Sequence, residues 1–141
     1  MNIEWKDSYL VGDGRIDAQH RHLFKLADLV VNAPDQNEFR LAAMQLYGYM
    51  RTHFADEEIL MRTNGYSAYR EHQRLHNELL ARFNAISRSF GQGAWNKDEI
   101  VTFMTQWLLE HVAQEDSKIA AHIRQQLPWL HPVLIATQKK T

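Results

Sequence analysis

Apolar residues recur at spacings of three and four along four stretches of the chain, and each stretch carries polar residues between them. This period is typical of amphipathic helices that bury one face. The first stripe contains Leu23, Phe24, Ala27, Val30 and Val31. We expect helices at about residues 17–33, 36–63, 67–90 and 97–126.

Residues that start and stop helices stand between these stretches. Asp17 is a candidate N-cap for the first helix, since its carboxylate can accept free amides of the first turn. Asn64-Gly65 supplies a left-handed C-terminal stop for the second helix. Gly91-Gln92-Gly93 breaks the third, and Pro128 follows the fourth. Short loops between long helices favour antiparallel neighbours, so we predict an all-α, up-down-up-down four-helix bundle.

The length of 141 residues predicts one domain, residues 1–141. We divide it into an irregular N-terminal arm at 1–16, the bundle at about 17–126 and a C-terminal tail at 127–141. Trp5, Tyr9 and Val11 are expected to pack the arm onto the bundle.

Composition narrows the possible functions. A net charge of −1 gives no reason to expect nucleic acid or anionic lipid as a partner. The chain has no cysteine, which excludes disulfides, thiolate metal sites and cysteine catalysis. No apolar run approaches the roughly 20 residues of a membrane helix, and residues 1–10 do not resemble a signal peptide. We therefore expect a cytoplasmic protein without membrane insertion.

Polar side chains interrupt the apolar stripe of every expected helix. They are five histidines and two carboxylates: His20, His53, Glu57, His72, His76, His111 and Asp116. His53 and Glu57, like His72 and His76, are four apart and share a helix face. His111 and Asp116 are five apart, about 140° around an α-helix. Both can still flank a site that lies between their directions.

A single histidine on an apolar stripe is more often a core residue than a ligand, and a single pair is weak evidence. Here all four helices contribute. Burying seven such groups without a metal would cost several kcal/mol for each unpaired charge. The set is too large for one ion and suits two ions of iron, manganese or zinc. The remaining histidines, His22, His122 and His131, are expected at the surface.

The motifs together resemble the hemerythrin family over about residues 5–119. The resemblance is carried by Trp5, Ile16-Asp17-Ala18-Gln19-His20, Tyr49, His53-Phe54, Glu57-Glu58, Met61, Gly65-Tyr66, His72, His76, Trp107-Leu108, His111 and Asp116.

This resemblance implies a non-haem centre of two iron ions in a four-helix bundle that binds O2 reversibly. It implies that His72, His76 and His111 hold one iron, and that His20 and His53 hold the other, which keeps an open position. Glu57 and Asp116 would bridge the irons together with an oxo or hydroxo group. Leu23, Trp107 and Leu108 match an apolar O2 pocket; ordinary core packing is the alternative, and both interpretations can hold together.

Two residues depart from the family pattern. Glu115 stands on the apolar stripe, where Val or Ile is expected, and Ile119 replaces a common aromatic residue. Glu115 is a possible extra ligand, a protonated acid that donates to bound peroxide, or a side chain that reaches solvent or an arginine. Glu58 is expected to form an exposed pair with Arg62.

Three functions follow. The leading one is reversible O2 binding for transport, storage or supply to an oxygen-consuming enzyme, without catalysis and without an attached output domain. The second is a diiron enzyme that reduces peroxide or O2 with Glu115 as ligand or proton donor. The third is metal storage or a non-redox site, for example for zinc. No Glu-x-x-His pair and no HExxH motif is present, which argues against ferritin-like enzymes and zinc proteases.

Overall fold

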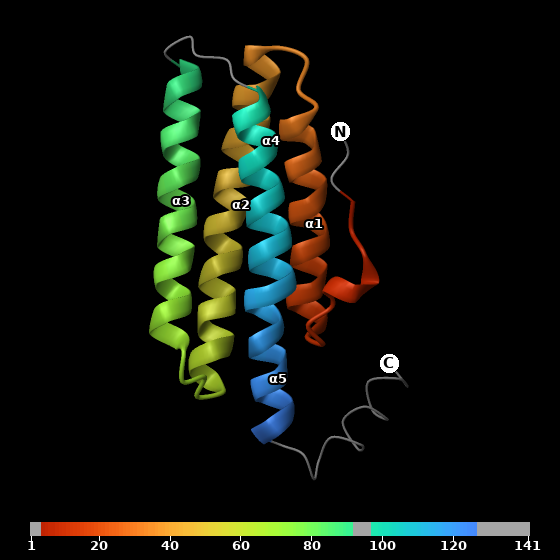
Figure 1. Ribbon diagram of the computed structural model, residues 1–141, viewed down its shortest axis with the longest axis vertical. Helices are drawn as coiled ribbons and strands as arrows, with labels where there is room; N and C mark the ends of the chain where they lie inside the picture. The colour runs from red at the N-terminus through yellow and green to blue at the C-terminus, as the bar shows by residue number, and fades with distance from the viewer. Residues whose placement is uncertain (1–3, 92–96, 127–141) are drawn as a thin grey trace.

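A computed structural model describes residues 4–91 and 97–126. Its elements, in chain order, are η1 (Asp7–Tyr9), α1 (Gly14–Val31), α2 (Gln36–Thr63), α3 (Tyr69–Gly91), α4 (Lys97–Gln106), η2 (Trp107–Glu115) and α5 (Asp116–Gln126). The last three elements follow one another without a gap and form one continuous helical column, called the fourth column below. In Figure 1, α1, α2, α3 and this fourth column lie side by side and alternate in direction, which confirms the predicted four-helix bundle. The expected tail at 127–141 and most of the Gly91-Gln92-Gly93 break lie outside the described residues.

The first helix begins earlier than the sequence suggested. Helix α1 starts at Gly14, and its N-cap is Asp13, whose side chain accepts the amide of Ile16 at 2.9 Å. Asp17 is therefore not the cap. Its buried carboxylate accepts the amides of Val11 at 2.7 Å and Gly12 at 3.2 Å. Asp17 thus ties the arm to the helix that the arm precedes.

The end of α2 agrees with the prediction. Gly65 has a φ of 62°, the left-handed conformation that glycine adopts without strain. The amide of Tyr66 donates to the carbonyl of Met61 at 3.0 Å, and the amide of Gly65 to that of Arg62 at 3.2 Å. This pair of bonds is the Schellman motif. It reverses the chain toward α3.

The fourth column is not a regular α-helix. Its middle, η2, is a π-helix of nine residues, and the amide of Asp116 donates to the carbonyl of His111, five residues back. Residues five apart consequently stand about one turn from each other there. The expected separation of 140° between His111 and Asp116 is wrong for this reason.

The core is formed by the apolar stripes, and the arm seals one side of it. Leu23, Leu46 and Leu108 have no exposed surface. In the arm, the Trp5 and Tyr9 rings each lie 5.4 Å from the Phe24 ring, measured between centroids. The arm therefore packs on α1 as predicted.

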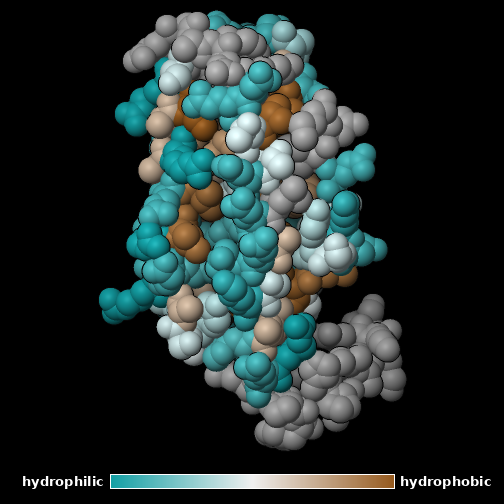
Figure 2. Space-filling model, viewed as in Figure 1, coloured by the Kyte–Doolittle hydropathy of each residue, from teal (hydrophilic) through white to brown (hydrophobic). Residues whose placement is uncertain are grey.

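The visible face of the bundle is largely hydrophilic, with separate hydrophobic spots (Figure 2). Large apolar side chains such as Met44, Leu41 and Leu29 are among the exposed ones. Within residues 4–91 and 97–126, no helix is both long and apolar enough to cross a membrane.

We predict that Asp17→Ala releases the arm, because two amides lose their buried acceptor. The free energy of unfolding should fall by about 1–3 kcal/mol, and the amides of Val11 and Gly12 should exchange faster with solvent. Urea unfolding and amide hydrogen exchange measure the two effects. The control Asp13→Ala removes a helix cap worth about 1 kcal/mol and should leave the Val11 amide protected. Unchanged exchange in Asp17→Ala would refute this role.

Candidate metal centre

The structure brings all seven candidate residues together at one level of the bundle, on α1, α2, α3, η2 and α5. Each side chain is at most 5% exposed. They form two groups whose nitrogen and oxygen atoms lie within 4.8 Å of one another. One group contains His72, His76, His111, Glu57 and Asp116, and the other contains His20, His53, Glu57 and Asp116.

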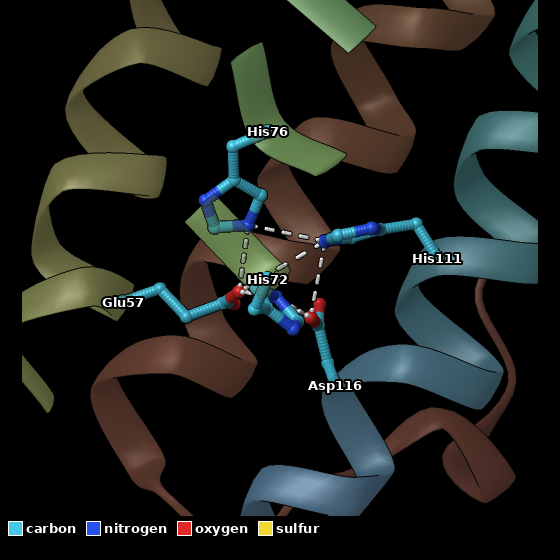
Figure 3. Close-up of side chains that lie close together, drawn as sticks. All are labelled: Glu57, His72, His76, His111 and Asp116. Atoms are coloured by element: carbon cyan, nitrogen blue, oxygen red, sulfur yellow. Dashed lines mark hydrogen bonds and ion pairs between the residues drawn. The ribbon is translucent and has the colours of Figure 1, made fainter. Parts of the chain in front are cut away.

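The three-histidine group, shown in Figure 3, is built by α2, α3 and the fourth column. The Nε2 atoms of His72 and His76 lie 2.9 and 3.0 Å from Oε1 of Glu57. Those of His72 and His111 lie 3.0 and 3.2 Å from Oδ1 of Asp116. His76 and His72 sit one turn apart on α3, so both rings point to the same place.

The two-histidine group uses the other oxygen of each carboxylate. Oε2 of Glu57 lies 3.4 Å from Nε2 of His20 and 3.2 Å from Nε2 of His53. Oδ2 of Asp116 lies 3.0 Å from Nε2 of His20. Glu57 and Asp116 therefore each point one oxygen at each group. This is the geometry of a carboxylate that bridges two cations.

The π-helix explains how Asp116 takes part. Because residues five apart stand about one turn from each other in η2, Asp116 lies on the same face as His111. Their side chains meet at 3.2 Å. In a regular α-helix the two side chains would diverge around the axis.

Several buried polar atoms of the site lack a well-aligned hydrogen bond, which tests whether cations fit it. Among the described residues, Nε2 of His20, Oε2 of Glu57 and both carboxylate oxygens of Asp116 make the close contacts given above but no well-aligned hydrogen bond. Nε2 of His76 also faces Nε2 of His111 at 3.1 Å. Buried polar atoms that lack aligned hydrogen bonds lower the stability of a fold. Two cations held among the nitrogen and carboxylate ligands would satisfy these atoms.

Electrostatics in the metal-free protein favours protons at the same positions. Burial lowers the pKa of His20, but hydrogen bonds and charge attraction from Asp116 and Glu57 outweigh it and raise that pKa to about 10. The same balance raises the pKa of His72 to about 9. Burial opposes ionisation of Glu57, yet the hydrogen-bonded histidines hold its pKa well below the ordinary value. The carboxylates thus stay anionic and attract positive charge.

Two candidate ligand histidines are oriented by residues whose role the sequence analysis did not predict. Nδ1 of His76 donates to Oε2 of Glu58 at 3.0 Å, and Nδ1 of His53 donates to Oε1 of Gln19 at 2.7 Å. The expected exposed pair of Glu58 with Arg62 is wrong, because the 16% exposed Glu58 side chain is turned toward α3. The usable signal was the position of Gln19 and Glu58, each directly beside a ligand in the sequence.

Glu115 lies outside both groups. Its side chain is 33% exposed, and both carboxylate oxygens lie 3.3 Å from Nζ of Lys118. Leu23, Trp107 and Leu108, the predicted pocket residues, are buried within the same core cluster. Each stands three or four residues from a ligand histidine. His22 is exposed, whereas His122 is half-buried and its Nε2 hydrogen-bonds the Asn64 carbonyl at 3.0 Å.

A cavity of about 220 Å³ opens beside the three-histidine group and reaches Trp107 and His111. Its other walls come from α3 and the fourth column, and include Leu75, Leu79, Glu78, Glu110 and Glu115. His111 and Trp107 are its buried lining residues, at 5% and 2% exposed.

A helical bundle with buried histidines and shared carboxylates on facing helices defines a metal-binding bundle protein. The sequence model of one family, described as hemerythrin HHE cation binding domain, matches residues 11–123. On this evidence the chain belongs to the hemerythrin family.

Three relatives illustrate the likeness. A hemerythrin chain of Sipunculus nudus is 33% identical, covering 81% of this chain and 87% of its own. Myohemerythrin of Riftia pachyptila is 31% identical, covering 84% and 92%. Bacteriohemerythrin of Pseudomonas paraeruginosa is 28% identical, covering 87% and 82%. A crystal structure of a hemerythrin leucine-to-alanine mutant has the same fold, with a TM-score of 0.77, 22% identity, and coverage of 87% of this chain and 98% of that one.

The metal-free protein should lose stability as the pH rises from 6.5 to 10. The pKa of His20 is about 10 in the fold against 6.5 as its ordinary value. The contribution of His20 to the free energy of unfolding is therefore complete below pH 6.5 and is lost as the pH rises through 10. Urea unfolding in the presence of a chelator measures this trend. The metal-loaded protein is the control and should respond less, because metal binding displaces these protons. A metal-free protein that becomes more stable over this range would contradict the assignment.

Proposed function

We propose that the chain holds two iron ions, joined by an oxo or hydroxo bridge, and binds O2 reversibly for transport, storage or supply. One observation carries the proposal. Glu57 and Asp116 each divide their two oxygens between a three-histidine and a two-histidine group. His72, His76 and His111 would hold one ion, and His20 and His53 the other.

The unequal number of histidines supports a role in ligand binding. Two histidines and two shared carboxylates leave the second ion with fewer protein ligands than the first, so that ion has room for O2. When bound, the two irons supply the electrons that O2 accepts and returns.

The protein's own residues supply orientation and protection. Glu57 and Asp116 would hold both ions, and Gln19 and Glu58 orient the rings of His53 and His76. Leu23, Trp107 and Leu108 exclude water from the same level of the bundle, each at most 2% exposed. Residues that exclude water and offer no proton slow the irreversible loss of reduced oxygen species.

The relatives named above point to the same class of function, and the enzyme alternative has no comparable support. Glu115, its proposed proton donor, faces Lys118 instead of the ligand groups. Function in the cytoplasm and delivery of O2 to an oxygen-consuming enzyme remain predictions from the sequence.

Anaerobic titration of the metal-free protein with Fe²⁺ should reach two ions per chain. Addition of O2 should then produce a charge-transfer absorption band that disappears on deoxygenation. His111→Gln should lower the number of ions bound, whereas the control Glu115→Gln should bind both, since Glu115 pairs with Lys118. Fewer than two ions in the wild-type chain would refute the diiron centre. Irreversible oxidation with peroxide turnover would favour the enzyme.

Leu108→Ala should shorten the lifetime of the oxygenated protein, because it opens space for water one turn from His111. Loss of the buried side chain should also lower the free energy of unfolding by about 2–5 kcal/mol. Leu46→Ala is the matched control, since Leu46 is equally buried but lies two turns from His53. It should destabilise the protein similarly and leave the lifetime unchanged. Equal shortening in both variants would assign the effect to general loosening.

A further inference from the structure

The three-histidine group is supported by a negatively charged residue. Glu58 is a carboxylate, so the Nδ1 atom of His76 must carry the shared proton, which leaves Nε2 free to face the cation. The second oxygen of Glu58 accepts from Nε2 of Gln73 at 2.9 Å. Both oxygens are therefore engaged, and the carboxylate is held against α3.

The two-histidine group is supported by a neutral residue. The Gln19 amide donates through Nε2 to Oδ2 of Asp56 at 2.8 Å. Because Asp56 can only accept, this bond turns Oε1 of Gln19 toward His53. Arg15 also donates to Asp56, at 3.0 Å. Nδ1 of His20, on the other ring of this group, is buried and has no hydrogen-bond partner within residues 4–91 and 97–126.

The two hydrogen bonds behind the ligand histidines thus have similar lengths, but their acceptors differ in charge. Nδ1 donates over 3.0 Å to a carboxylate in one group and over 2.7 Å to an amide in the other. A carboxylate behind an imidazole makes the opposite nitrogen a stronger ligand than a neutral acceptor does. With the Glu58 side chain only 16% exposed, water screens its charge incompletely.

We propose that Glu58 and Gln19 are positioning residues whose difference in charge makes the two metal positions unequal in affinity. The position formed by His72, His76 and His111 fills first and holds its ion more tightly, and Glu58 supplies part of that difference. Gln19 orients His53 without adding charge and so keeps the second position weaker. This inference rests on the proposed two-metal centre.

Competition between a chelator and the metal-free protein for Fe²⁺, under anaerobic conditions, yields two stepwise dissociation constants. Glu58→Gln should weaken the tighter step by about 10- to 100-fold and leave the weaker step unchanged. Gln19→Glu combined with Asp56→Asn, which replaces the carboxylate facing Gln19 by an amide that can donate to the new carboxylate, should strengthen the weaker step by a similar factor. His20→Ala, which removes a ligand of the two-histidine group alone, identifies which step belongs to which position. Glu71→Gln is the matched control, since the exposed Glu71 on α3 pairs with Arg74, and neither step should move.

Thermal unfolding of each metal-free variant separates positioning from folding, because a purely structural role changes the melting temperature without opposite shifts of the two constants. The inference is overturned if Glu58→Gln changes both steps equally or neither. It is also overturned if the Gln19→Glu, Asp56→Asn double variant, which leaves Glu58 intact, fails to strengthen the weaker step. Failure of the wild-type chain to bind two ions would instead refute the proposed function.

Discussion

The structure depends on the burial of two carboxylates beside five imidazoles at one level of a helical bundle. Water cannot solvate Glu57 and Asp116 there, since each is 1% exposed. Their charge has to be balanced by protons on histidine or by cations between the two groups. The raised pKa values of His20 and His72 and the crowding of three imidazoles around the two oxygens of Asp116 both follow from this requirement.

The surrounding helices bring these side chains to one level of the bundle. Helices α1, α2 and α3 do so with regular α-helical geometry, and the fourth column does so with a π-helix. On α2 and α3 the i,i+4 spacing alone aims His53 with Glu57 and His72 with His76. The fourth column has its two ligands five apart and adopts a π-helix between them. The arm, held by Asp17 and by Trp5 against Phe24, packs on α1 and also contacts η2.

The four-helix bundle and the seven candidate ligands could be predicted from the sequence because both follow from the hydrophobic period of α-helices. An apolar stripe marks the buried face, and a histidine within it must point inward with that face. The same reasoning fails where hydrogen bonds depart from the period. No residue between Trp107 and Glu115 announces a shift to i→i+5 bonding, so the relation of His111 to Asp116 was predicted wrongly.

Contacts between elements that are distant in the sequence could not be predicted either. Asp13 and Asp17 are both credible caps, and only the position of the arm decides between them. Glu58 had a local partner in Arg62, but a partly buried bond to His76 wins over an exposed pair that contributes a few tenths of a kcal/mol. When a side chain can pair with either a near or a distant residue in the sequence, its burial decides between them. The hydrophobic period does not predict burial for a residue at the edge of an apolar stripe.

The π-helix has a consequence for anyone who transplants this centre into a designed protein. Four ideal, straight helices reproduce the contributions of α1, α2 and α3 but offer no face that presents both His111 and Asp116. A design on such a template has to move the carboxylate by one position or accept an irregular rod. The centre is therefore portable as a set of residues only together with the backbone irregularity that aligns them.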